Sequence, residues 1–144
     1  AHAEFLLFDD DTTMLAQTMI SQLAAWVALI GFVGMAAFQL LLALGAPLGH
    51  LAWGGFHRRL PGWLRIGSLL AVGIYAFGIL CVLEQMGWAA VLGSPALADG
   101  TLWALAGLFG LSTVGNLASR SPLERRVMTP VALVLAAACV VLAL

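Results

Sequence analysis

The chain has no lysine, and its 144 residues carry only six basic and seven acidic side chains. Charged residues make up 9% of the sequence and hydrophobic residues 62%. An ordinary soluble domain carries about a quarter charged residues on its surface and elsewhere, so this balance excludes that class. Instead it indicates an integral membrane protein, and we expect membrane lipids rather than nucleic acid among its partners.

The sequence also lacks the residue patterns of several enzyme and transporter classes. It has no phosphate-binding loop, no nucleophile elbow and no HExxH zinc motif. No Asp, Glu, Lys, Arg or His is predicted near the middle of a long apolar run, where proton-coupled and ion-coupled transporters normally carry such a residue. We therefore expect a non-enzymatic protein with no cofactor and no coupled transport.

What the chain does contain is four long apolar runs, each near the roughly 20 residues that span a bilayer. Backbone groups in hydrocarbon must be paired within their own segment, so each run is predicted to be helical. A membrane β-barrel would need shorter segments of alternating polarity. The sequence predicts one all-α domain, 1–144, built as a four-transmembrane-helix bundle with spans at about 22–44, 64–83, 102–119 and 127–144.

All six arginines fall in two connections between these runs. The first group is Arg58, Arg59 and Arg65, and the second is Arg120, Arg125 and Arg126. Because positively charged loops stay on the cytoplasmic side, we expect both arginine-rich loops inside and both termini outside. All six arginines are expected to contact anionic lipid headgroups. Four tryptophans are predicted as interfacial anchors: Trp53 and Trp63 at the inner boundary, Trp88 and Trp103 at the outer one.

Each arginine-rich loop has its own local pattern. Residues 45–65 combine prolines, glycines and exposed aromatic positions, which predicts an interfacial hairpin or a broken helix. In the second loop, Ser121 to Glu124 reads as a capping box that starts a short helical turn. Glu124 is expected to cap that turn or to pair with Arg120 or Arg125, and Pro130 either restarts or kinks the following helix.

Polar residues recur near the predicted inner boundary of the bundle. Ser112, Asn116 and Ser119 share one face of the third span, at about the depth expected for Gln39 and Ser68. Such groups either hydrogen-bond one another between helices or line a pocket for a polar molecule. These five residues are the candidate binding residues.

Small residues form stripes that would let helices pack closely. They are Ala24, Ala28 and Gly31 in the first span, Gly67, Ala71 and Gly78 in the second, and Ala132, Ala136, Cys139 and Ala143 in the fourth. On the opposite face of the third span, Gly107 and Gly110 would admit a further helix or another subunit.

Histidine and cysteine suggest further alternatives. His50 and His57 lie in one loop, and a metal or haem site between them is an outside hypothesis, because no supporting ligand cluster has suitable spacing. Cys81 and Cys139 do not form a Cys-x-x-Cys pair, so we expect two buried thiols. A disulfide between them is the alternative.

The first residues do not resemble a signal peptide, since they have no basic segment before a short apolar core. Residues 1–13 are either an exposed native tail or an added tag ahead of a start at Met14. The run Asp9 to Asp11 is interpreted as solvated charge, with a weak cation site as the alternative.

Segments of both arginine-rich loops resemble a known family. They are Gly45-Ala46-Pro47-Leu48-Gly49, Ala52-Trp53-Gly54-Gly55, Leu60-Pro61, Leu64-Arg65-Ile66, Asn116-Leu117-Ala118-Ser119-Arg120-Ser121, Glu124-Arg125 and Met128-Thr129-Pro130-Val131. Together they are similar to an uncharacterised family of small bacterial four-span integral membrane proteins. The resemblance implies a multi-pass protein of the bacterial inner (cytoplasmic) membrane and carries no established activity.

Three functional hypotheses follow. The leading one is an accessory or structural component that packs against another membrane protein or forms a homo-oligomer. The second is a carrier for a small molecule or lipid, acting as an oligomer, and it predicts a water-accessible cavity near Asn116. The third is a redox or haem-binding membrane protein.

Overall fold

The computed structural model describes the backbone of residues 2–144 and the side chains of residues 12–144. This part of the chain contains no strand. Its helices are α1 (His2–Ala43), α2 (Gly62–Gln85), α3 (Pro95–Leu117) and α4 (Pro122–Ala143), with the single 3₁₀ turns η1 (Gly49–Leu51) and η2 (Trp53–Gly55) between α1 and α2. All four α-helices are long and apolar enough to cross a membrane, so the predicted all-helical, multi-pass architecture is confirmed at this level.

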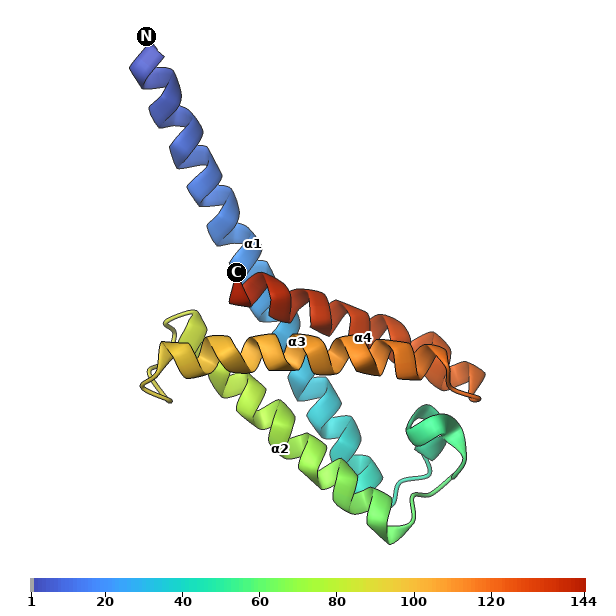
Figure 1. The fold of residues 1–144 in the computed structure, drawn as a ribbon. Coiled ribbons are helices and arrows are strands. Elements are labelled where there is room, and N and C mark those ends of the chain that lie inside the picture. Colours follow the sequence, from blue (N-terminus) through green and yellow to red (C-terminus); the bar gives the residue numbers. More distant parts are fainter. Residues whose placement is uncertain (1) are drawn as a thin grey trace.

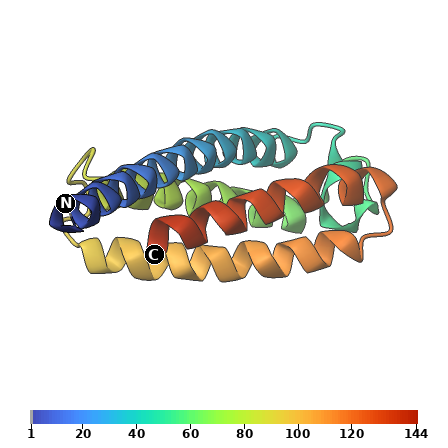
Figure 2. The ribbon, with the colours of Figure 1, turned by 90° about the horizontal axis from the view of Figure 1, so that it is seen from above.

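The helices form two antiparallel hairpins that pack on each other (Figure 1). One hairpin is α1 with α2 and the other is α3 with α4; between them, α1 lies against α4 and α2 against α3. Figure 2 shows the α1–α2 and α3–α4 connections at the same end of the bundle. The α2–α3 connection and the carboxyl terminus lie at the opposite end, so the arginine-bearing loops are brought together.

All four helices begin before the spans predicted from hydropathy: α1 starts at His2 rather than Gln22, and α2 at Gly62 rather than Leu64. α3 starts at Pro95 rather than Leu102, because the Ser94 hydroxyl accepts a hydrogen bond from the Leu97 N–H at 3.3 Å and caps the helix. α4 starts at Pro122 and runs through Pro130 without a break. The expected short turn and the fourth span are therefore one helix, since a single missing backbone donor does not outweigh packing along its length.

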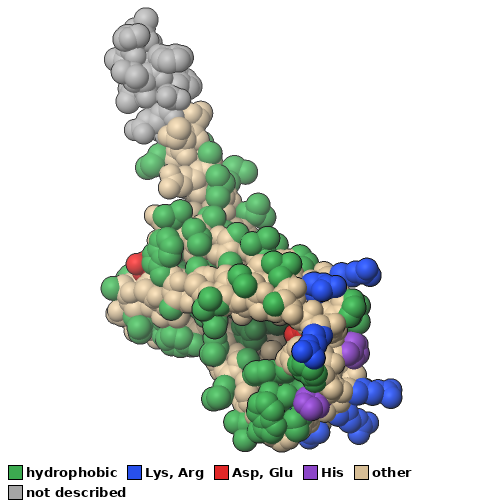
Figure 3. Space-filling model, turned by 45° about the vertical axis from the view of Figure 1, so that its right-hand side comes forward, with side chains coloured by type: hydrophobic (Ala, Val, Ile, Leu, Met, Phe, Trp, Pro, Cys, Tyr) green, Lys and Arg blue, Asp and Glu red, His purple; other side chains and the backbone are tan. Residues whose placement is uncertain are grey.

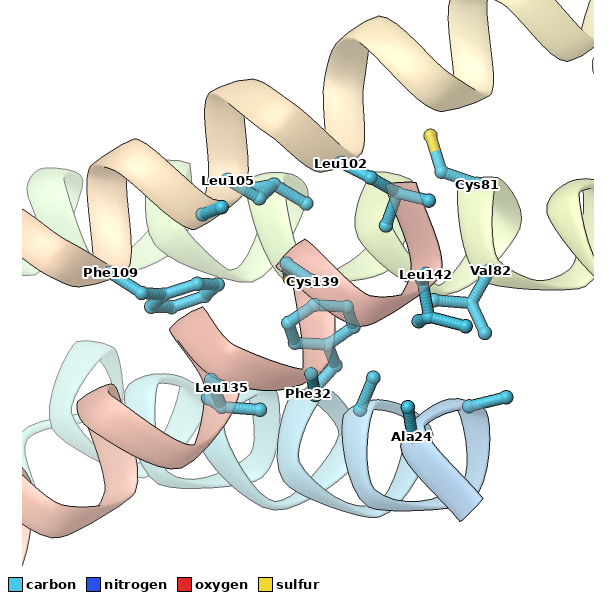
Figure 4. Packing of buried hydrophobic residues seen from close by; sticks show 14 of the residues in the cluster. Ala24, Phe32, Cys81, Val82, Leu102, Leu105, Phe109, Leu135, Cys139 and Leu142 are labelled. Carbon is cyan, nitrogen blue, oxygen red and sulfur yellow. The ribbon is translucent and has the colours of Figure 1, made fainter. Parts of the chain in front are cut away.

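Aromatic rings occupy the centre of the buried core (Figure 4), and small residues lie where the helices contact one another. Phe32 from α1, Tyr75 from α2 and Phe109 from α3 pack ring against ring, with centroids 5.7 to 6.2 Å apart. Gly78 makes room for them: a Cβ there would lie 3.0 Å from the Phe32 ring. Gly31 likewise lies directly against the Leu135 side chain. Close helix approach at small residues therefore positions the aromatic centre, as the stripes predicted.

Cys81 and Cys139 are both buried and both free. They lie within the apolar core cluster, where Figure 4 shows them on α2 and α4. They act there as small apolar side chains.

At the end of the bundle away from the arginines, Glu84 closes the α2–α3 connection. Its carboxylate accepts hydrogen bonds from the N–H groups of Val91 at 2.7 Å and Leu92 at 2.9 Å. The role is local: these bonds satisfy backbone donors in the turn that follows α2.

Candidate functional site

The α1–α2 loop is folded onto the α3–α4 loop by specific contacts. The Ser121 hydroxyl donates to the His50 carbonyl at 2.6 Å, and Gly55 lies directly against the Ser121 side chain. Trp53 adopts a positive φ of 55°, followed by Gly54 at 79° and Gly55 at 72°. Only glycine reaches such φ values at no steric penalty. The tight turn η2 thus carries Trp53 and Gly54 into the end of the bundle.

Glu124 is the centre of this junction. It is only 4% exposed, and its carboxylate accepts from the Ser119 hydroxyl at 2.5 Å and from the Gly54 N–H at 3.3 Å. The Ser121 hydroxyl accepts from the Glu124 N–H at 3.3 Å, as a capping box requires. In a capping box the glutamate side chain normally accepts from the N–H of the cap residue. Here the Ser119 hydroxyl accepts from the Ser121 N–H at 3.1 Å and in turn donates to Glu124.

This geometry corrects one expectation and refines another. Glu124 does take part in capping α4, but through Ser119 rather than by direct contact with the Ser121 N–H. Its carboxylate points into the bundle, whereas Arg120 and Arg125, the partners considered for it, are exposed. The carboxylate also lies at the N-terminus of α4, where the helix dipole favours negative charge.

A cavity of about 320 Å³ lies inside this junction. Three of its polar lining residues come from the predicted layer: Gln39, Ser112 and Asn116. The full lining is Met35, Phe38 and Gln39 of α1; Leu51, Ala52, Trp53 and Gly54 of the loop; Tyr75 of α2; Phe109, Ser112, Gly115 and Asn116 of α3; and Glu124, Met128, Val131, Ala132 and Leu135 of α4. Every helix contributes, so the cavity exists only when the two hairpins are packed.

The other two predicted residues lie beside the cavity and act as hydrogen-bond partners. Ser68 is fully buried, and its hydroxyl accepts from the Trp53 indole Nε1 at 3.4 Å. Ser119 is 7% exposed and is committed to Glu124. Trp53 is part of the cavity wall and is also 43% exposed, so its role as an interfacial anchor stays a prediction.

Gln39 is the unusual member of the lining. It is 9% exposed, and its Oε1 atom is buried without a hydrogen-bond partner in the described residues. A buried polar atom left unpaired destabilises a protein by about 1 to 3 kcal/mol. The atom itself is enclosed by protein rather than open to the cavity, and Gln39 also forms a side-chain hydrogen bond with Tyr75, another lining residue.

The arginines surround this end of the molecule without lining the cavity. Figure 3 shows the basic side chains and the histidines gathered at one end, beside a hollow between the helices. Five arginines are exposed; Arg65 is half-buried and donates from Nε to the Leu60 carbonyl at 2.9 Å. Arg120 lies over the Phe56 ring, 5.5 Å from its centroid. Their contact with anionic headgroups stays a prediction.

His50 and His57 are both exposed on the basic loop. Within the described residues, no group of three or more histidine, cysteine, aspartate or glutamate side chains is placed to hold a metal ion. The side chains of Asp9 to Asp11, considered for a weak cation site, lie outside the described residues.

Sequence reasoning missed Glu124 as a cavity residue. The capping box already accounts for a glutamate three residues after Ser121, so this pattern did not point to a cavity. A second signal was available: the polar face of Ser112 and Asn116 ends only a short loop before Glu124, so the three groups were bound to lie near one another.

Comparisons with protein-family models, with curated proteins and with solved structures find no match to this chain.

Proposed function

We propose that this multi-pass membrane protein binds a small molecule in the cavity between its two hairpins. The observation that carries the proposal is the cavity of about 320 Å³ whose wall contains the buried Glu124 and the polar residues Gln39, Ser112 and Asn116. Such a combination of mostly apolar walls and a few convergent polar groups is typical of ligand sites. It favours the second hypothesis from the sequence, which required a cavity near Asn116.

Binding rather than catalysis is the role we propose. Glu124 is the one ionisable acid among the described lining residues, and both of its oxygens already accept hydrogen bonds. General acid–base chemistry normally needs a group free to exchange a proton with the substrate, often with a second group to position it. A carboxylate held by Ser119 and Gly54 is better suited to fixing a ligand.

We further propose that the cavity lies at the cytoplasmic face of a bacterial inner membrane. The distribution of arginines supports this orientation, since both arginine-bearing loops occupy the same end of the bundle. The resemblance of the loop segments to small bacterial four-span proteins supports the membrane. In this arrangement both termini are outside, and the exposed arginines contact anionic headgroups around the mouth of the cavity.

A second candidate function is that of a subunit, and α1 is the observation that favours it. At about 1.5 Å per residue, its 42 residues extend about 63 Å, roughly twice the hydrocarbon thickness of a bilayer. All side chains from residue 12 to residue 20 are exposed, including Met14, Leu15 and Met19. On α3, the predicted Gly107 face is open, with no atom within 4 Å of a built Cβ. Another membrane protein or a second copy would cover these surfaces.

Cysteine accessibility tests the cavity directly. The variant Ser112→Cys places a thiol on the cavity wall, and Leu111→Cys places one on the neighbouring position, which is 74% exposed on the outside of the bundle. Methanethiosulfonate reagents react with the thiolate, which forms in water and not in hydrocarbon. We expect a small hydrophilic reagent to modify Ser112→Cys in membranes and to leave Leu111→Cys unmodified. The unsubstituted protein, whose two cysteines are buried, gives the background.

The cavity proposal would be overturned by an unreactive thiol at position 112 in folded protein. Equal modification at positions 111 and 112 would also overturn it, because it would show that water reaches this depth without a cavity. For the subunit candidate, a stoichiometric partner recovered after gentle solubilisation is the supporting result, and a monomer without partners is the opposing one.

A further inference from the structure

The charge of the cavity wall indicates which class of ligand it accepts. Among the described lining residues, Glu124 carries the only formal charge, and no arginine or histidine side chain reaches the wall. An anionic ligand would therefore meet a carboxylate with no cation to offset it. A cationic ligand would instead be stabilised by that carboxylate in surroundings of low dielectric constant.

The hydrogen-bonding capacity of the wall agrees with the charge. A carboxylate offers about four acceptor sites, and Glu124 uses two of them for Ser119 and Gly54. A ligand that brings N–H donors would satisfy the remaining acceptor sites of this carboxylate.

The remaining wall suits an apolar body with a positive end. Trp53, Tyr75 and Phe109 present aromatic side chains to the cavity, and cations are attracted to the faces of such rings. Methionines and leucines complete the apolar part, and Met35 and Met128 adapt easily to different shapes. The volume of about 320 Å³ is at the small end of ligand pockets.

We propose that the cavity recognises an organic ammonium group attached to an apolar body, with Glu124 as its counter-ion. This inference rests on the proposed binding function and specifies its ligand class. Two sources supply such a group: a free amphipathic amine, or the headgroup of an aminophospholipid. In the second case the exposed arginines around the site, such as Arg120, are placed to meet the lipid phosphate.

Three matched probes test the charge requirement: 2-phenylethylammonium, the neutral 2-phenylethanol and the anionic 3-phenylpropanoate. Each is titrated calorimetrically into the full chain in phosphatidylglycerol nanodiscs, with empty nanodiscs as the blank for partitioning. We expect saturable binding of the ammonium probe alone. Repeating the titration in nanodiscs that contain phosphatidylethanolamine separates the sources: a weakened apparent affinity supports the lipid headgroup, and an unchanged affinity supports the free amine.

Variants of the chain test the residues. Glu124→Gln keeps the size and one acceptor oxygen, and we expect it to weaken ammonium binding by about tenfold to a hundredfold, the range for a hydrogen bond to a charged group. Asp99→Asn removes one carboxylate at the opposite end of the bundle, on α3, and should leave the affinity unchanged.

Several results would overturn the ammonium proposal. They are binding of 2-phenylethanol as tight as that of the ammonium probe, preferred binding of 3-phenylpropanoate, or unchanged affinity in folded Glu124→Gln. Should Glu124→Gln fail to fold, the comparison of the three probes on the unsubstituted chain decides in its place. If no probe binds while the thiol of Ser112→Cys is still modified, the ammonium proposal fails and the binding cavity stands. If that thiol is unreactive, both fail.

Discussion

Ser119 connects two parts of the junction, and its removal should be unusually destabilising for a single hydroxyl. The side chain is 7% exposed; it donates to the Glu124 carboxylate and accepts from the Ser121 N–H. A hydrogen bond to a charged group contributes about 1.5 to 3 kcal/mol, and an N–H left without its acceptor adds about 1 kcal/mol or more. Ser119→Ala should therefore lower the free energy of unfolding by about 2 to 4 kcal/mol.

Ser68→Ala is the matched control. Ser68 is also buried, at 0% exposure, and its hydroxyl has a neutral partner, the Trp53 indole, at 3.4 Å. A neutral hydrogen bond of this kind contributes about 0.5 to 1.5 kcal/mol, so Ser68→Ala should destabilise less. The two variants delete the same atom from buried positions; Ser119 loses a bond to a charged partner and a second bond from the Ser121 N–H, whereas Ser68 loses one neutral bond.

The assay is reversible unfolding in mixed micelles, in which the denaturing detergent is increased and helix content is followed by far-ultraviolet circular dichroism. Free energies are compared at a common detergent fraction for the two variants and the unsubstituted chain. Equal losses for Ser119→Ala and Ser68→Ala would refute the argument that the Glu124 carboxylate is the dominant partner. A loss below about 1 kcal/mol for Ser119→Ala would refute the connection itself.

Two further predictions use the same assay. Gly49→Ala should prevent stable docking of the first loop, because the added Cβ would overlap the His57 carbonyl. Gly62→Ala is the control and should leave stability nearly unchanged, because no atom lies near the added Cβ. Equal losses of stability in the two variants would contradict the loop geometry. Phe32→Ala should destabilise by about 3 kcal/mol or more, because the ring is 0% exposed and packs on two other rings. Leu111→Ala, on the lipid-facing side of α3, should change stability by less than about 1 kcal/mol, and a larger loss would show that this face is covered.

Part of the site follows from local patterns in the sequence. Helical spacing places Ser112 and Asn116 on one face of α3, and both do line the cavity together with Gln39. The same spacing counted Ser68 and Ser119 with them, although the structure uses their hydroxyls for Trp53 and Glu124. Spacing assigns a residue to a face of its own helix, but it does not determine which neighbouring group the side chain meets.

The sequence by itself determined that four segments are helical and long enough to cross a membrane, because in hydrocarbon each backbone donor must find its acceptor a few residues away. It also determined that a helical turn starts at Pro122, since Ser121 and Pro122 act within one turn, although only the structure showed that this turn and the fourth span are one helix. Only the tertiary structure decided that Glu124 is buried and that Trp53 lines a cavity. Those outcomes depend on the docking of two loops, through bonds such as Gly54 N–H to Glu124, whose partners are 70 residues apart. No periodic pattern in the chain encodes contacts over that separation; they form only when both hairpins have packed.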